Sequence, residues 1–210
     1  MTDIRHADES TLGTDSGLAR DPPKRVLGTL GALARRWPTA LAIASAAVIV
    51  AGDPSNDSVG RLAEVLLFLP LLYLVVSTLR RPALTWVVLI VGVVVTSVPP
   101  ALGWADLPVV LLAAALAATV WGGTHGRFGD GSYFTVQVVG MVAFGAVALL
   151  AMTVGPTASR YLVAAGWLAH GVWDFVHLWR DRVVARSYAE WCGVVDVVVA
   201  AQLVVLPLLV

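Results

Sequence analysis

The sequence has 210 residues, of which 58% are hydrophobic and only 13% are charged. Soluble domains average about 45–50% apolar and about 25% charged residues, so this composition indicates that lipid surrounds much of the chain. The formal net charge of +0 gives no indication of a nucleic-acid partner, and the single cysteine, Cys192, excludes an intramolecular disulfide.

The N-terminal region divides into two parts. Residues 1–25 are polar, contain a proline pair and show no apolar period, which predicts a disordered cytoplasmic tail. In residues 26–36, apolar side chains recur at helical spacing beside basic residues. This segment is either a short amphipathic helix on the inner leaflet or an extension of the first span.

A series of apolar segments separated by polar loops makes up the rest of the chain. Each is near the ~20 residues that a helix needs to cross a bilayer, so we predict an all-α integral membrane bundle of seven spans over residues 37–210. The predicted spans are residues 37–52, 62–79, 83–103, 106–122, 132–154, 157–179 and 189–209.

The basic residues predict the orientation of the bundle. When tail and loops are assigned alternately to two sides, one side holds only Arg61 and Arg160. The other side holds Arg5, Arg20, Lys24, Arg25, Arg35, Arg36, Arg80, Arg81, Arg127, Arg180, Arg182 and Arg186. Basic residues stay in the cytoplasm, so this asymmetry places the N-terminus inside and the C-terminus outside. Abundant Ala, Val and Gly beside one lysine are typical of a GC-rich bacterial genome and predict a bacterial plasma membrane as the location.

Ionisable residues within spans predict the functional site, because each costs about 2.5–3.5 kcal/mol to insert into lipid. His170, Asp174 and His177 recur at positions i, i+4 and i+7 of the sixth predicted span and therefore share one helix face. The seventh span returns from the same membrane surface and brings Asp196 to the same depth. We expect His170, Asp174 and Asp196 to form a cluster near the cytoplasmic side.

Several other polar residues in or near the predicted spans lie outside this predicted cluster. His125 and Gln137, at the inner ends of spans four and five, approach the same membrane level. Glu64 lies near the outer end of span two and is expected to be separate. Cys192 shares a face with Asp196 but is interpreted as a small hydrophobic residue near the interface, because nothing in the sequence indicates a reactive thiol.

Three hypotheses account for the cluster. In the first, the cluster binds a metal ion, with Zn²⁺ as the candidate: either His170 with Asp174 or Asp174 with His177 would be ligands, and the third residue would support them. His125 of span four, or span seven, could complete the shell. Alternatively, a buried carboxylic acid acts without a metal, and Asp174 and Asp196 serve as acid and base with His170 and His177 as partners. In the third hypothesis the cluster is structural and joins helices by polar contacts, with a proton-coupled transporter as a variant.

The pattern HGVWDFVH at residues 170–177, followed by Tyr188, Cys192 and Asp196, resembles one found in small bacterial multi-span proteins that have no known activity. This resemblance covers only the last two spans. The size, span count and buried acids Glu64 and Asp196 resemble membrane-embedded terpene cyclases, which implies a cyclisation chemistry on isoprenoids.

A further resemblance is to the seven-span hydrolases related to alkaline ceramidases and adiponectin receptors. His125, His170, His177 and Asp174 have the residue types of that family's zinc ligands. The family's paired-histidine spacing on the last span is absent. Together, these observations predict an intramembrane enzyme acting on a lipid or isoprenoid, either an acid–base cyclase or isomerase or a metal-dependent hydrolase. The alternative is a non-enzymatic membrane protein, either a transporter or a structural subunit.

Overall fold

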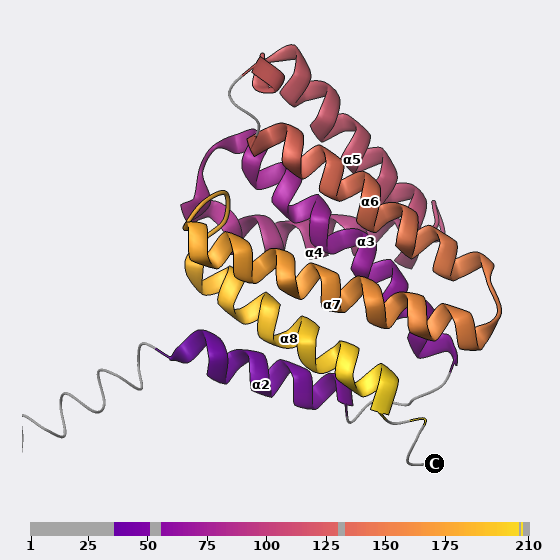
Figure 1. Cartoon of the computed structure of the whole chain (residues 1–210). Coiled ribbons are helices and arrows are strands. Elements are labelled where there is room, and N and C mark those ends of the chain that lie inside the picture. Colours follow the sequence, from indigo (N-terminus) through magenta and orange to yellow (C-terminus); the bar gives the residue numbers. More distant parts are fainter. Residues whose placement is uncertain (1–35, 51–55, 130–132, 206, 208–210) are drawn as a thin grey trace, which may run out of the picture. The chain divides into compact units, whose positions relative to one another are not determined.

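A computed structural model describes residues 36–50, 56–129, 133–205 and 207. All regular structure in these residues is helical (Figure 1). The α-helices are α2 (Trp37–Val50), α3 (Asn56–Leu79), α4 (Thr85–Ala101), α5 (Leu107–Thr124), α6 (Tyr133–Thr153), α7 (Pro156–Arg180) and α8 (Arg186–Val205). Two short 3₁₀ helices, η1 (Pro82–Leu84) and η2 (Arg127–Gly129), lie in the connections. An all-α fold is thereby confirmed, and a helix occurs at each of the seven predicted spans. The proposed tail at 1–25 and interfacial helix at 26–36 lie outside the described residues, apart from Arg36.

Prolines and glycines set the ends of the helices. Pro108 and Pro156 stand in the first turns of α5 and α7, where their missing N–H groups need no partner. Pro99 and Pro100 fall in the last turn of α4, and Gly103 takes a positive φ of 67° in the turn that follows. The chain therefore breaks between α4 and α5, as the predicted spans 83–103 and 106–122 require.

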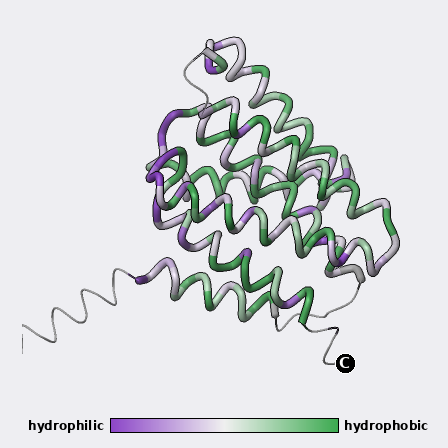
Figure 2. The backbone as a smooth tube through the Cα atoms, viewed as in Figure 1, coloured by the Kyte–Doolittle hydropathy of each residue, from purple (hydrophilic) through white to green (hydrophobic). Residues whose placement is uncertain are grey.

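Among the described residues, five helices are long and apolar enough to cross a membrane. They correspond to α3, to α4 with the preceding η1, and to α5, α6 and α8. Figure 2 shows hydrophobic residues along the helices and hydrophilic residues gathered where helices end. Two helices do not meet this standard: α2 is short, and α7 carries His170, Asp174 and His177.

The helices differ in how much of their surface they bury. α3 packs against α5, α6 and α7, and its leucines form the centre of the hydrophobic core. α4 and α5 instead expose large apolar side chains, among them Ile90, Val94 and Leu116. Contiguous apolar surface of this kind is unusual on a water-soluble protein and suits a helix surrounded by lipid.

The polar core lies where α7 packs against α8, the most extensive helix pair of the bundle. Across this interface each of two glycines faces an acid of the other helix. A Cβ added at Gly171 would lie 3.2 Å from Cβ of Asp196, and one added at Gly193 would lie 3.2 Å from Cβ of Asp174. The absence of two side chains therefore lets both acids enter the interface from opposite helices.

Candidate metal centre

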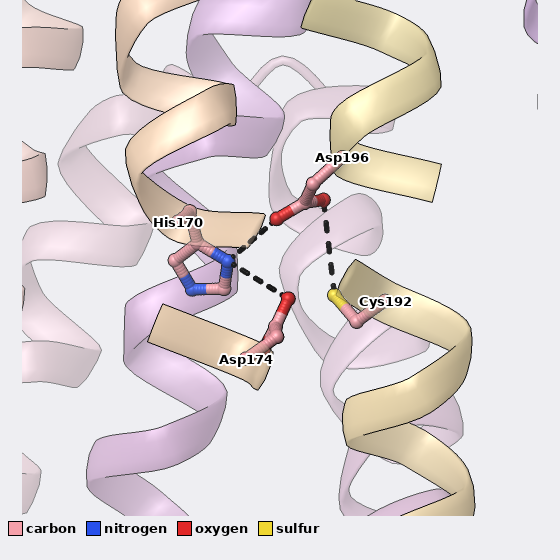
Figure 3. A group of neighbouring side chains, drawn as sticks. All are labelled: His170, Asp174, Cys192 and Asp196. Atoms are coloured by element: carbon pink, nitrogen blue, oxygen red, sulfur yellow. Dashed lines mark hydrogen bonds and ion pairs between the residues drawn. The ribbon is translucent and has the colours of Figure 1, made fainter. Parts of the chain in front are cut away.

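His170 lies between the two acids of the interface. Its Nδ1 is 2.8 Å from Oδ2 of Asp196 and 3.3 Å from Oδ2 of Asp174, and all three side chains are fully buried (Figure 3). The predicted cluster of His170, Asp174 and Asp196 is therefore present, with its three members on α7 and α8.

Cys192 belongs to the same group. Its Sγ is 3.9 Å from Oδ1 of Asp196 and 3.6 Å from the hydroxyl of Tyr188. One ligand atom from each of His170, Asp174, Cys192 and Asp196 can be chosen so that all lie within 4.8 Å of one another. We call these four residues the buried centre; Figure 3 shows their side chains converging from the two helices.

Aromatic rings hold the imidazole of His170 in place. Tyr73 and Phe144 contact it edge-on, with ring centroids 5.7 Å and 5.0 Å away. Its Nε2 is shielded from solvent and has no hydrogen-bond partner among the described residues. The ring orientation is therefore set by packing on one side and by the two acids on the other.

Tyr73 of α3 orients Asp174. Its hydroxyl donates a hydrogen bond to Oδ1 of Asp174, which leaves Oδ2 turned toward His170. In the part of the chain that the structure describes, this Oδ2 has no hydrogen bond. Carboxylates that bind metals are usually oriented by a hydrogen bond from a neighbouring residue. The hydrogen bond from Tyr73 would orient Asp174 in the same way.

Replacing Tyr73 by Phe is expected to lower the free energy of unfolding by about 1.5 kcal/mol. Interhelical hydrogen bonds in membrane proteins average about 0.6 kcal/mol and reach about 1.7 kcal/mol. The upper value is expected here because the hydrogen bond is accepted by a fully buried carboxyl group. Unfolding in mixed micelles measures the loss. Tyr161→Phe, which alters a half-exposed tyrosine, is the matched control. An equal effect in both variants would contradict the assigned role of Tyr73.

His177 lies beside the centre but outside it. Its Nδ1 is 2.8 Å from the backbone oxygen of Trp173, and its Nε2 is 3.1 Å from Nε2 of Gln137. With the proton on Nδ1, the ring donates to the carbonyl and accepts from the Gln137 amide. Its ring also contacts that of Tyr73 at 4.9 Å, and the Tyr73 hydroxyl in turn donates to Asp174.

The structure places two other candidate residues away from the buried centre. His125 is exposed at the end of α5, where its Nδ1 is 2.8 Å from the backbone oxygen of Trp121. Glu64 is half-buried in α3 and is not a member of the group. The remaining four candidates, His170, Asp174, His177 and Asp196, are all buried in the same part of the bundle.

Sequence reasoning missed two contributors. Tyr73 lies within an apolar stretch of α3. A hydroxyl in such a stretch indicates a polar partner, so the sequence did contain a signal for this contact. Cys192 shares a face with Asp196 in the sequence, but its spacing alone does not indicate a ligand. Helix spacing alone does not show whether a thiol at that position meets a histidine from the neighbouring helix.

The charge balance of the centre limits its chemistry. Two ionised carboxylates would carry one more negative charge than a protonated His170 can offset, and buried charges are found paired or bound to metals. A divalent cation with a neutral His170 would balance both acids. Ligands at about 2.0–2.3 Å from a tetrahedral ion are about 3.3–3.8 Å apart. Nδ1 of His170 is 2.8 Å from Oδ2 of Asp196 and 3.3 Å from Oδ2 of Asp174, and the ligand atoms of all four residues lie within 4.8 Å of one another. The most widely separated ligand atoms would therefore have to move closer together around an ion.

Fold and centre together define a class: an all-helical protein with several helices able to cross a membrane and a buried His/Asp/Cys group. In comparisons with known proteins, no family model, curated protein or solved structure matches this chain. The family resemblances drawn from the sequence stay predictions.

Proposed function

We propose that this chain is a seven-span protein of a bacterial plasma membrane, with its N-terminus in the cytoplasm. The distribution of basic residues supports this orientation. α7 would count as a span because His170, Asp174 and His177 are buried against other helices rather than exposed to lipid, as intramembrane ionisable residues usually are. α2 would span about 21 Å at 1.5 Å per residue, so it would cross a thinned part of the bilayer or with the help of flanking residues.

Within this bundle, the buried centre would bind a divalent transition-metal ion, with Zn²⁺ as the leading candidate. The observation that carries this proposal is the convergence of four buried ligand atoms within 4.8 Å. Mixed nitrogen, oxygen and sulfur ligands are the set that Zn²⁺ accepts. Oδ2 of Asp174 adds support: it lies 3.3 Å from Nδ1 of His170 but accepts no hydrogen bond among the described residues, and an ion would satisfy this buried acceptor.

The proposed activity is metal-dependent hydrolysis of a lipid or isoprenoid substrate. His170, Asp174 and Asp196 would be three protein ligands, which leaves a fourth position for water as in catalytic zinc sites. The centre is enclosed by apolar helices, so the substrates with access from the membrane are hydrophobic ones. Ligation by Cys192 as well would instead close the shell and make the ion structural.

The metal content of protein purified in an uncharged detergent tests the metal proposal. We expect about one ion per chain after exposure to Zn²⁺ and removal of the excess, and a loss of most of it in Asp174→Asn and Asp196→Asn. Asp106→Asn is the matched control, because Asp106 precedes α5 and its side chain caps nothing. Size-exclusion profiles verify that each variant is folded. A metal-free wild type, or equal metal in all variants, would sink the proposal.

Cobalt substitution separates the two coordination schemes. If Cys192 is a ligand, Co²⁺-loaded protein will show a thiolate-to-metal charge-transfer band that Cys192→Ser abolishes. If three ligands and a water surround the ion, the band will be absent while the ligand-field bands persist. The second outcome favours catalysis and the first favours a structural ion.

A second candidate function needs no metal. Side-chain contacts connect Asp196, His170, Asp174 and Tyr73 in that order. The 2.8 Å separation between Asp196 and His170 is that of a hydrogen bond. Such a chain would serve acid–base chemistry, proton-coupled transport or a purely structural role. Absence of metal, with lipid turnover or proton uptake lost in Asp196→Asn, would favour this candidate.

A further inference from the structure

A cleft of about 410 Å³ lies at the end of the bundle where α3 and α7 terminate and α6 begins. It is separate from the buried centre, and none of the four residues of that centre lines it. Its lining residues are Val76, Ser77, Arg80, Pro82, Arg127, Tyr133, Phe134, Asp181, Arg182 and Val183. We call this region the arginine cleft.

The lining of the arginine cleft is cationic. Among the described residues that line it, Arg80, Arg127 and Arg182 are basic and Asp181 alone is acidic. Asp181 has a further cationic neighbour outside the lining, because Nη1 of Arg186 is 3.9 Å from its Oδ1. The electrostatic potential of the cleft therefore favours an anion.

Two of the guanidinium groups are held in ways that suit a bound anion. Arg182 lies over the ring of Tyr133, 4.9 Å from its centroid, which limits the positions it can take. Nε of Arg127 is shielded from solvent and, among the described residues, has no hydrogen-bond partner. A buried donor without an acceptor is costly, and an anionic ligand would supply the acceptor.

Non-glycine residues with positive φ gather around the same cleft. In the part of the chain that the structure describes, the non-glycine residues with positive φ are Arg80 at 54°, Asp181 at 50° and Val183 at 74°. All three line the cleft. Arg80 and Asp181 take this conformation directly after α3 and α7, where helices commonly end in the left-handed region. For β-branched Val183 the conformation is unfavourable, and such outliers gather at functional sites.

We propose that the arginine cleft binds a phosphate group. Planar guanidinium groups match phosphate oxygens with paired, charge-assisted hydrogen bonds. The remaining lining includes Val76, Pro82 and Phe134, which would contact a hydrocarbon part of the same ligand. The phosphate belongs either to a lipid headgroup or to a free anion, and binding at this site does not depend on the proposed metal.

Ligand titrations on the whole protein in dodecyl maltoside test this proposal. The Kd for phosphatidic acid is measured from thermal stabilisation, with phosphatidylcholine as the lipid lacking net charge and inorganic pyrophosphate as the free anion. Arg127→Gln/Arg182→Gln is expected to weaken the binding at least about tenfold, since each lost charge-assisted hydrogen bond is worth about a factor of ten. Stabilisation by phosphatidic acid alone identifies a lipid phosphate, and stabilisation by pyrophosphate identifies a free one.

The matched control is Arg81→Gln/Arg180→Gln. These arginines are exposed near the same helix ends but do not line the cleft, so the variant loses the same surface charge. It should keep wild-type affinity. Equal weakening in both double variants, or no stabilisation by either phosphate compound, would overturn the proposal. If the cleft variant does not fold, Arg182→Gln alone alters an exposed side chain and is expected to weaken binding in the same direction.

Discussion

His170→Ala is expected to lower the free energy of unfolding by about 3–5 kcal/mol, the largest effect of any single change proposed for this protein. Removing one member of a buried ionic group leaves its partners without compensation. Here Asp174 and Asp196 would both remain in the core, on two helices that pack directly together. Denaturation in mixed micelles, followed by tryptophan fluorescence or circular dichroism, gives the change in free energy.

A double variant distinguishes this electrostatic cause from simple loss of packing. Adding Asp196→Asn to His170→Ala should recover part of the stability, because the acid that Nδ1 contacts at 2.8 Å no longer carries a charge. His125→Ala, at an exposed histidine, should cost well under 1 kcal/mol. A small loss in His170→Ala, or a second full loss on adding Asp196→Asn, would show that the centre is not an ionic group.

Gly171→Leu is expected to separate α7 from α8 and cost at least about 3 kcal/mol, the upper part of the usual range for an overpacked interior. A Cβ at this position would already lie 3.2 Å from Cβ of Asp196 and 3.3 Å from the backbone oxygen of Gly193. Backbone atoms of the neighbouring helix cannot move aside as a flexible side chain would. Because the two acids lie on opposite helices, the same change should also abolish metal binding at the buried centre.

Gly60→Leu is the matched control for helix propensity. Gly60 also lies within a helix, but nothing stands within 4 Å of a Cβ added there. Stability and metal content should stay near the wild-type values. If Gly171→Leu behaves in the same way as Gly60→Leu, then close contact between α7 and α8 is not what assembles the centre.

The sequence was most informative where one physical rule acts along the chain. The need for about 20 apolar residues per crossing located the helices to within a few residues at most ends. α4 was predicted at 83–103 and runs from Thr85 to Ala101. α3 differs most, beginning at Asn56 rather than at residue 62, because polar residues can extend a helix beyond its apolar stretch.

Three residues of the buried centre could be predicted from helix periodicity and the order of the spans. His170 and Asp174 are one turn apart on α7, so any helix at this position places them on one face. The short connection to α8 made Asp196 a neighbour, which the structure confirms at 2.8 Å from His170. These are local consequences of the helical repeat, and they hold whatever surrounds the two helices.

Other features depended on packing between elements far apart in the sequence. Tyr73 reaches Asp174 across 101 positions, and Gln137 reaches His177 across 40. His125 was placed at the correct end of its helix but is exposed, because helix order does not determine which face turns inward. The sequence by itself determined the helices and the polar face of α7. Only the tertiary structure decided which side chains meet there, because those contacts depend on the rotation and close approach of helices that no periodic pattern specifies.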